Sequence, residues 1–453
     1  MADIGDYLHC EAPRFEEELI QWLAIPSVSA QEIRRNEVRR AAAWAADQLR
    51  RLAFQVEEIP TAGHPLVYAE SPPVGGAPVA LVYGHYDVQP AEPLEAWTAP
   101  PFAPARRGGR LYARGASDDK GQVFTHIKGV EALQAVEGRL PLQVKFLLEG
   151  EEEIGSPNLH PFVAENAARL ACDCVVISDT SQFAPGLPGI VYGLRGIAYY
   201  DLLVRGPHRD LHSGSYGGAV TNPANALARM LSALFDDRGR VTLEGFYDDV
   251  VPLSDCERRQ LAELPFDEKR FLRSVGVDGS TGEEGYTVLE RRWARPTCDL
   301  CGLTAGYQGE GAKTVLPATA SAKISFRLVP HQDPEQIGQA LKRKLAQVCP
   351  PGIRFELSGH HGSPGVLVSL ESPYLRSAAA AIERAFGRAP VFIREGGSIP
   401  VVATLHQVLE ADLLLLGWGQ EGDQVHAPDE SFALADFHRG IRASAELWKE
   451  LGR

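Results

Sequence analysis

The chain has 453 residues, of which 44% are hydrophobic and 23% charged, an ordinary globular composition with enough length for two domains. Its formal net charge of -14 is not offset by any run of Lys and Arg, which argues against binding to nucleic acid. The N-terminal segment lacks the basic start and apolar stretch of a secretion signal, and no apolar run is long enough to span a membrane, so a cytoplasmic protein is expected.

The first part of the chain alternates helical and strand patterns. Residues 31–54 carry apolar side chains at helical spacing, many alanines and no Gly or Pro, which predicts a helix. Residues 78–84, 142–150 and 174–179 are mainly apolar and predict buried strands, with a helix over about 120–136 between them. Because such strands need cover on both faces, the pattern predicts an α/β fold with a mixed, mainly parallel sheet between helices.

The middle of the chain has a different pattern. Residues 190–206 and 321–330 predict strands, residues 222–237 and 333–349 predict helices, and residues 353–359 predict a further strand. These elements predict a compact α+β layer with a β-α-β-β-α-β, ferredoxin-like arrangement.

From residue 391 the chain returns to α/β character. An apolar strand is expected in ADLLLLGWG and a final helix through HRGIRASAELWKEL. We therefore expect a catalytic, metal-binding domain made of residues 1–194 and 391–453, with residues 195–390 inserted as a second domain.

The cysteines do not indicate a disulfide framework. Their number is seven, so they cannot all pair within one chain, and reduced thiols are expected. Cys298 and Cys301 form a lone CxxC without a second pair at zinc-finger spacing, which favours buried or incidental thiols over a metal or redox site.

Polar residues follow the predicted apolar strands. His85 and Asp87 come directly after the strand at 78–84 and, being two apart, face the same side. Asp87 is suitably placed to fix the tautomer of a ligating His85. An isolated HxD would more often be a solvated strand end.

This pair is not isolated in the sequence. Asp118 and Asp119 follow a Gly-containing turn, residues 151–153 are three glutamates after the next strand, and Asp179 ends another. The carboxyl ends of parallel strands meet at one edge of a sheet, so these acids are expected to crowd together. Crowded carboxylates repel one another unless cations neutralise them, and two divalent metals are the simplest solution.

A second imidazole is expected to complete this site. Two metals bridged by a carboxylate and a water would need about five protein ligands, and zinc takes both His nitrogen and carboxylate oxygen. His426 follows the predicted strand ADLLLLGWG and is a candidate, although composition and spacing alone do not choose it over the other histidines.

The ordered motifs resemble a known family. HYDVQP, RGASDDKG, LLEGEEEIGS and VISD are similar to motifs of the M20 metallopeptidases. DLHSGSYGG, GEGAKTVLP, FRLVP, REGGSIP and VHAPDE resemble its cytosolic non-specific dipeptidase and carnosinase branch, and the likeness runs from about Phe15 to the C-terminus. The resemblance implies a zinc-peptidase-like catalytic domain, an inserted lid and dimerisation domain, a homodimer, and two divalent ions, zinc or manganese.

The resemblance also implies which residues hold the metals. One ion would be bound by His85 and Asp179 and the other by Glu153 and His426, with Asp118 bridging the two. The peptide bond between Asp118 and Asp119 is expected to be cis.

Further roles follow from the same resemblance. Glu152 would be the general base, Asp87 would orient His85, and His212 would steady the oxyanion, commonly from the neighbouring subunit of a dimer. Substrate binding, particularly of a terminal carboxylate, would fall to Thr314, Arg327, His361 and Ser398. The chain departs from the branch at Glu151, which makes the choice among three glutamates depend on alignment, and at APDE after His426.

The sequence thus predicts a hydrolase that cleaves the amide bond of a dipeptide or small peptide with metal-activated water. An N-acyl or N-succinyl amino acid deacylase of the same superfamily would use the same metals and base, although LHSGSYGG, GAKTVLP and REGGSIP favour the dipeptidase. A non-catalytic metal-binding relative should lack Glu152 or Asp87, and both are present. A two-metal phosphatase or nuclease is a further alternative; the acidic balance opposes nucleic acid but not a small phosphate ester.

Overall fold

The computed structural model describes residues 3–360 and 362–453. Contacts divide the chain into two compact units: unit 1 comprises Met1–Tyr192, Val368–Ile393 and Thr404–Arg453, and unit 2 comprises Gly193–Leu367 and Arg394–Ala403. The sequence placed the second domain boundary at 390, whereas the contacts assign residues 368–390 to unit 1. The reason is α12 (Pro373–Phe386), which packs against α14 (Leu434–Leu451) and β17 (Asp412–Leu416) of that unit.

Unit 1 is built on a mixed sheet. Its order is β1 (Gln55–Ile59), β2 (Leu66–Glu70), β6 (Gln143–Glu149), β3 (Val79–His85), β7 (Cys174–Ile177), β17 and β8 (Gly189–Leu194). The pairs β6–β3, β3–β7 and β7–β17 are parallel, while the pairs nearer the edges are antiparallel. The predicted mainly parallel sheet is therefore confirmed. β8 crosses into unit 2 and also pairs with β16 (Val391–Glu395).

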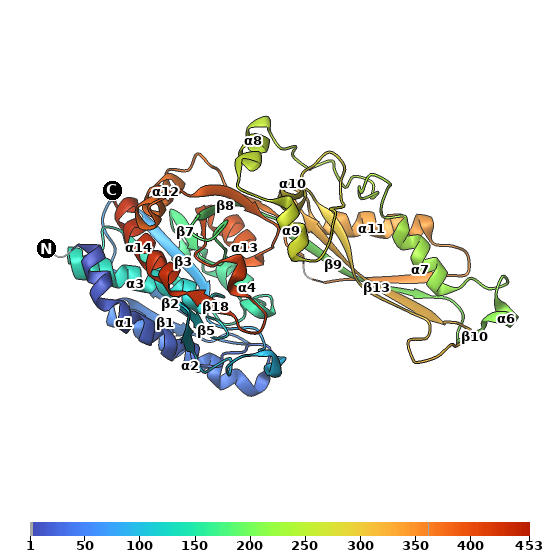
Figure 1. The fold of residues 1–453 in the computed structure, drawn as a ribbon, viewed down its shortest axis with the longest axis horizontal. Coiled ribbons are helices and arrows are strands. Elements are labelled where there is room, and N and C mark those ends of the chain that lie inside the picture. Colours follow the sequence, from blue (N-terminus) through green and yellow to red (C-terminus); the bar gives the residue numbers. More distant parts are fainter. Residues whose placement is uncertain (1–2, 361) are drawn as a thin grey trace. The chain divides into compact units, whose positions relative to one another are not determined.

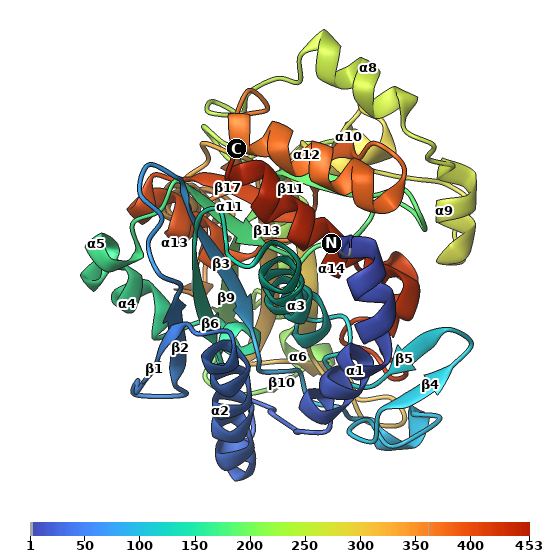
Figure 2. The same ribbon diagram turned by 90° about the vertical axis from the view of Figure 1, so that its left-hand side faces the viewer.

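Three long helices of unit 1 pack against one another. α1 (Ile4–Leu23), α3 (Lys120–Glu137) and α14 lie side by side in Figure 2 and contact each other. α3 is buried over almost all of its first three turns, so its sequence lacks the polar face of a surface helix. It ends at Gly138, whose φ of 76° suits the left-handed residue that follows a helix.

Shorter elements complete unit 1. These are η1 (Glu32–Arg34), α2 (Arg35–Arg51), η2 (Leu94–Ala96), η3 (Glu152–Ile154), α4 (Leu159–Glu165), α5 (Ala167–Leu170), α13 (Pro400–Leu409, which begins in unit 2) and η4 (Glu421–Asp423). A small antiparallel sheet joins β4 (Ala105–Arg107), β5 (Arg110–Tyr112) and β18 (Ser431–Ala433). Through this sheet the segment before α3 and the segment before α14 lie together, although some 300 residues separate them in the chain.

Unit 2 contains a four-stranded antiparallel sheet in the order β11 (Thr297–Ala305), β13 (Thr319–Leu328), β9 (Gly196–Arg205) and β14 (Arg354–Gly359). α7 (Pro223–Ser232) and α11 (Pro334–Val348) pack on it, as Figure 1 shows, and their apolar side chains share one core with those of β9 and β13. The chain order is β9, α7, β11, β13, α11, β14, the predicted β-α-β-β-α-β arrangement. The predicted strand over 190–206 is instead two strands, β8 and β9, separated at Arg195.

Unit 2 contains further short elements, of which β15 pairs with β8 in the mixed sheet. They are β10 (Leu211–His212), α6 (Ser213–Tyr216), α8 (Asp255–Glu263), α9 (Glu268–Ser274), α10 (Val288–Trp293), β12 (Val315–Leu316) and β15 (Val366–Leu367). The seven cysteines are all free. Among the helices of the described residues, none combines the length and apolar character needed to cross a membrane.

Candidate metal centre

The acidic residues predicted from the strand ends do converge in unit 1. His85 is the last residue of β3 and is fully buried, and the acids that follow β6 and β7 lie at the same edge because these three strands are parallel. Packing is close at this edge. A Cβ at Gly84 would lie 2.7 Å from Asp119 Oδ2, so glycine lets the start of α3 approach β3.

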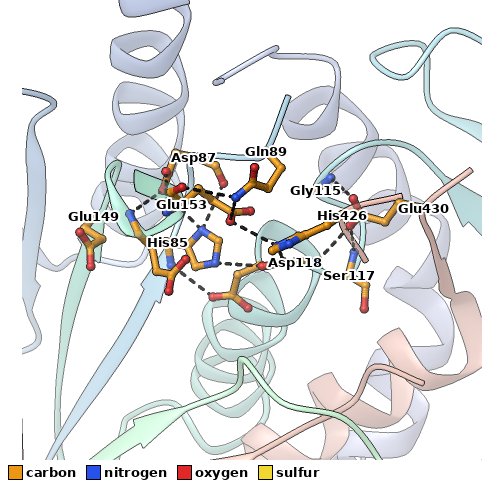
Figure 3. Close-up of polar contacts among 12 residues, drawn as sticks. His85, Asp87, Gln89, Gly115, Ser117, Asp118, Glu149, Glu153, His426 and Glu430 are labelled. Carbon is orange, nitrogen blue, oxygen red and sulfur yellow. Dashed lines mark hydrogen bonds and ion pairs between the residues drawn. The ribbon is translucent and has the colours of Figure 1, made fainter. Parts of the chain in front are cut away.

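Two groups of possible ligand atoms share one carboxylate. The first group comprises His85, Asp118 and Asp179, and the second comprises Asp118, Glu153 and His426, with the ligand atoms of each group within 4.8 Å of one another. Asp118 Oδ1 lies 3.0 Å from His85 Nε2, and its Oδ2 lies 2.8 Å from His426 Nε2 (Figure 3). The Asp118–Asp119 peptide bond is cis, as expected.

The second group is completed by Glu153 of η3, which follows β6, and by His426 in the loop before β18. Glu153 Oε2 lies 3.3 Å from His426 Nε2 and also accepts a hydrogen bond of 2.7 Å from Gln89 Nε2. His426, in contrast to His85, has an exposed side chain. The cluster is therefore buried on the side of the sheet and open on the side of His426.

The electrostatics of the cluster reflect its crowded carboxylates. Burial raises the pKa of Asp179 well above its usual range, and the charges of Asp118 and Asp119 add to this effect. Hydrogen bonds to Asp118 and Glu153 raise the pKa of His426 to about 10. Burial would lower the pKa of His85, but its contacts with Asp118 and Asp87 outweigh burial and raise it. Protonation of the His85 and His426 imidazoles thus offsets part of the negative charge of the carboxylates.

These residues fit a pair of divalent cations. A cation that took imidazole nitrogens and carboxylate oxygens would supply the positive charge that the two rings otherwise provide by binding protons. The donor set of two imidazoles and three carboxylates is of the kind that zinc accepts. One shared carboxylate between the two groups is also the arrangement that a bridged pair of metals requires.

The three consecutive glutamates are separated by their contacts. Glu151 points to other partners, because its Oε1 accepts from the His64 backbone N–H at 3.1 Å and its Oε2 from Asn158 at 2.7 Å. Glu153 belongs to the second group. Burial raises the pKa of Glu152 to about 7, against the opposing effect of His85. The sequence left open which of the three glutamates is the base and which is a ligand. The contacts of Glu151 narrow this choice to Glu152 and Glu153, whose surroundings differ.

Asp87 has a wider set of contacts than the sequence suggested. Its carboxylate accepts hydrogen bonds from the backbone N–H groups of Glu152 (3.2 Å, to Oδ1) and Glu153 (3.1 Å, to Oδ2). The His85 ring nitrogen Nδ1 lies 3.2 Å from the Asp87 backbone carbonyl oxygen and 3.4 Å from the carboxylate. Asp87 therefore connects the orientation of His85 to the start of η3, which carries both glutamates.

Four of the remaining predicted residues lie in unit 2, where they form two pairs. His212 of β10 and Thr314 are close, since β10 pairs with β12 and Ser213 N donates to Thr314 O at 3.0 Å. Arg327 Nη1 donates to Ser398 Oγ at 2.9 Å. His361 lies outside the described residues.

Three contacting residues were not identified from the sequence. Gln89 donates to Glu153, while Glu430 and Asp423 accept hydrogen bonds from the segment that carries Asp118. Gln89 and Glu430 lie in motifs that were recognised, HYDVQP and VHAPDE, so their positions beside predicted ligands were the available signal.

Comparison with known proteins identifies the family. A family model described as "Peptidase family M20/M25/M40" matches residues 81–450. The chain belongs to this family. It is 32% identical over 453 residues to the Cys-Gly metallodipeptidase dug1 of Schizosaccharomyces pombe, covering 96% of this chain and 95% of that protein.

Two further proteins are similar over nearly their full lengths. The Beta-Ala-His dipeptidase of Homo sapiens is 30% identical over 470 residues, covering 99% of this chain and 92% of the relative. The structure of the M20 family metallo-carboxypeptidase Sso-CP2 from Sulfolobus solfataricus has a TM-score of 0.87 at 33% identity, covering 97% and 99% of the two chains. The family resemblance and the fold class predicted from the sequence are confirmed.

Proposed function

We propose that this chain is a metal-dependent dipeptidase of the M20 family. The observation that carries the proposal is the convergence of two groups of ligand atoms on the single carboxylate of Asp118. Two relatives similar over nearly their full lengths, one named a Cys-Gly metallodipeptidase and the other a Beta-Ala-His dipeptidase, support dipeptides as the substrate class.

His85 and Asp179 would hold one cation, Glu153 and His426 the other, and Asp118 both. The chemistry that the cations supply when bound is a water of lowered pKa and polarisation of the substrate carbonyl. Glu152 would accept the proton of that water and later transfer it to the leaving amine, a task suited to a pKa that burial raises to about 7. Asp87 would keep Glu152 and His85 in place through the contacts described above.

The residues of unit 2 would bind the substrate. Arg327 offers a planar guanidinium for a terminal carboxylate, and its contact with Ser398 places a hydroxyl donor beside it. His212 would stabilise the oxyanion, with Thr314 as its neighbour. His361 stays a predicted substrate contact.

The substrate class is tested by comparing hydrolysis of free dipeptides with that of blocked compounds. Ala-Leu, Cys-Gly and β-Ala-His should be cleaved with much higher kcat/KM than N-acetyl-leucine, N-succinyl-leucine or N-acetyl-Ala-Leu. Greater turnover of the N-acyl amino acids would replace the proposal with the deacylase. Efficient cleavage of N-acetyl-Ala-Leu would favour a carboxypeptidase, the activity named for Sso-CP2.

We propose zinc as the native metal, with manganese as the alternative, on the basis of the imidazole and carboxylate donors. Elemental analysis of the purified protein would give two equivalents of the native metal per chain. Reconstitution of the metal-free protein with each ion would then rank them by kcat/KM. A cytoplasmic location is proposed from the free cysteines, which suit a reducing compartment.

A homodimer is proposed in which His212 serves the site of the other copy. H212A and E152A chains should each be inactive, but after mixing and reassembly they should recover about a quarter of wild-type activity, because half of random dimers are mixed and each has one complete site. No recovery in reassembled dimers would place His212 in its own chain's site. A monomer by light scattering would refute the dimer.

A further inference from the structure

The loop that carries His426 has an unfavourable backbone. Gln424, His426 and Asp429 have φ values of 56°, 61° and 59°, in the left-handed region that residues other than glycine rarely adopt. Such conformations are energetically unfavourable and persist where surrounding contacts enforce them. The contacts that hold this loop therefore bear on the position of the His426 imidazole.

Glu430 provides the most extensive of these contacts. Its side chain is fully buried, and four donors point at it. Oε1 accepts from the backbone N–H groups of Ser117 at 3.0 Å and Asp118 at 3.1 Å, while Oε2 accepts from Gly115 N at 2.9 Å and Arg114 Nη1 at 2.8 Å. Figure 3 shows this carboxylate between the loop of His426 and the turn of Asp118. A carboxylate has about four acceptor sites, so Glu430 has no capacity left to bind a cation itself.

A second carboxylate, that of Asp423, holds the same loop; Asp423 precedes His426 in the sequence, whereas Glu430 follows it. Asp423 is also fully buried, and its Oδ2 accepts from Ser117 Oγ at 2.8 Å and from Gln420 N at 2.8 Å. Its Oδ1 accepts from Arg110. Ser117 is thus held twice, by its backbone N–H through Glu430 and by its hydroxyl through Asp423. The two carboxylates flank His426 and tie its loop to the residue that precedes Asp118.

We propose that Glu430 is a positioning residue for the pair of cations, a role that rests on the metal centre proposed above. By binding the backbone N–H of Asp118 while standing four residues from His426, it fixes the shared carboxylate and the exposed imidazole relative to each other. The ligands of the second group come from three distant segments. Without Glu430, a cation would have to order the loop of His426 as it bound, and its affinity would fall by that cost.

The variant E430Q tests this role. A glutamine offers one carbonyl oxygen where the carboxylate offers two, so some of the four donors lose their acceptor and Arg114 loses its counter-charge. We expect the affinity for the more weakly bound of the two cations to fall by about 10- to 100-fold. The measurement is titration of zinc into the metal-free full-length protein against a chelator of known affinity, followed by the spectrum of the cobalt-substituted protein.

A control variant disrupts another buried Arg–Glu ion pair, which lies outside the metal cluster. Glu283 is 8% exposed and binds Arg295 through two hydrogen bonds of 2.7 and 2.8 Å in unit 2. E283Q should therefore lower the melting temperature without changing either zinc affinity. If E430Q does not fold, E430D keeps the charge but is one methylene too short to reach all four donors, and it should show a smaller loss of zinc affinity.

The outcomes separate this inference from the proposed function. A wild-type protein that binds two zinc ions, with E430Q or the folded E430D binding both as tightly, would overturn the role of Glu430 alone. A wild-type protein that binds no zinc at this cluster, with D118N indistinguishable from it, would overturn the metal centre itself. Equal losses of zinc affinity in E430Q and E283Q would also refute a positioning role, because a general loss of stability would then explain both.

Discussion

Replacement of Asp87 by asparagine is expected to lower activity while preserving the fold. The carboxylate accepts one backbone N–H on each oxygen, from Glu152 and Glu153, and lies 3.4 Å from the His85 ring. In D87N one of these oxygens becomes an amide NH₂ that faces a backbone N–H. One hydrogen bond to a charged group is lost, which costs about 1.5–3 kcal/mol. Because η3 carries both glutamates, we expect kcat/KM to fall by about 10- to 150-fold.

The assay is kcat/KM for Ala-Leu hydrolysis, with metal content measured on the same sample. D173N is the matched control, since Asp173 accepts a hydrogen bond of 2.7 Å from Val79 N at the opposite end of β3, far from the cluster. This control should keep near wild-type kcat/KM. A D87N enzyme with near wild-type kcat/KM and two bound metals would show that the contacts of Asp87 do not position the reacting groups.

Three further predictions concern the base, the metals and a buried histidine. E152A should retain fold and metals but lose about 10²–10⁴-fold or more in kcat; an active E152A enzyme would exclude Glu152 as the base. Removal of the cations by a chelator should abolish activity and lower the melting temperature, and excess zinc should restore both; ions at 100 times their Kd contribute about 2.7 kcal/mol to stability. Burial lowers the pKa of His126 to about 3, while the ordinary value is 6.5. The unfolded chain therefore binds the proton first as pH falls, and His126 should cost up to about 1.4 kcal/mol per pH unit between pH 6.5 and 3. Denaturant unfolding of wild type and H126Q should show a shallower slope in the variant; equal slopes would contradict this.

The elements that the sequence predicted well are those whose pattern follows from burial. β3, β6 and β7 are mainly apolar because they lie inside a covered sheet, and their ends predicted where the acids would gather. The strand β11 was missed. It lies at the edge of the sheet of unit 2, and most of its residues are exposed or partly exposed, so TCDLCGLTA has no apolar alternation to detect.

The boundary between the two units was hard to predict from the sequence for a different reason. α12 is amphipathic with small apolar residues on its buried face, Ala378 and Ala381 among them, which predicts a helix but not which domain it packs on. Its contacts with α14 and β17 assign it to unit 1.

The contacts of Glu430 and Asp423 explain why the ligands were easier to predict than what holds them. A ligand such as His85 is indicated by its residue type and its place at a strand end. Glu430 is an acid in a loop, and only its four donors, three of them backbone N–H groups about 315 residues away in sequence, distinguish it from a solvated carboxylate. A backbone N–H group is present in every residue type except proline, so the sequence does not indicate which of these groups will donate to a given carboxylate. The pairing of β5 with β18 brings these segments together, so the geometry around Asp118 depends on a small sheet of three-residue strands as much as on the ligands.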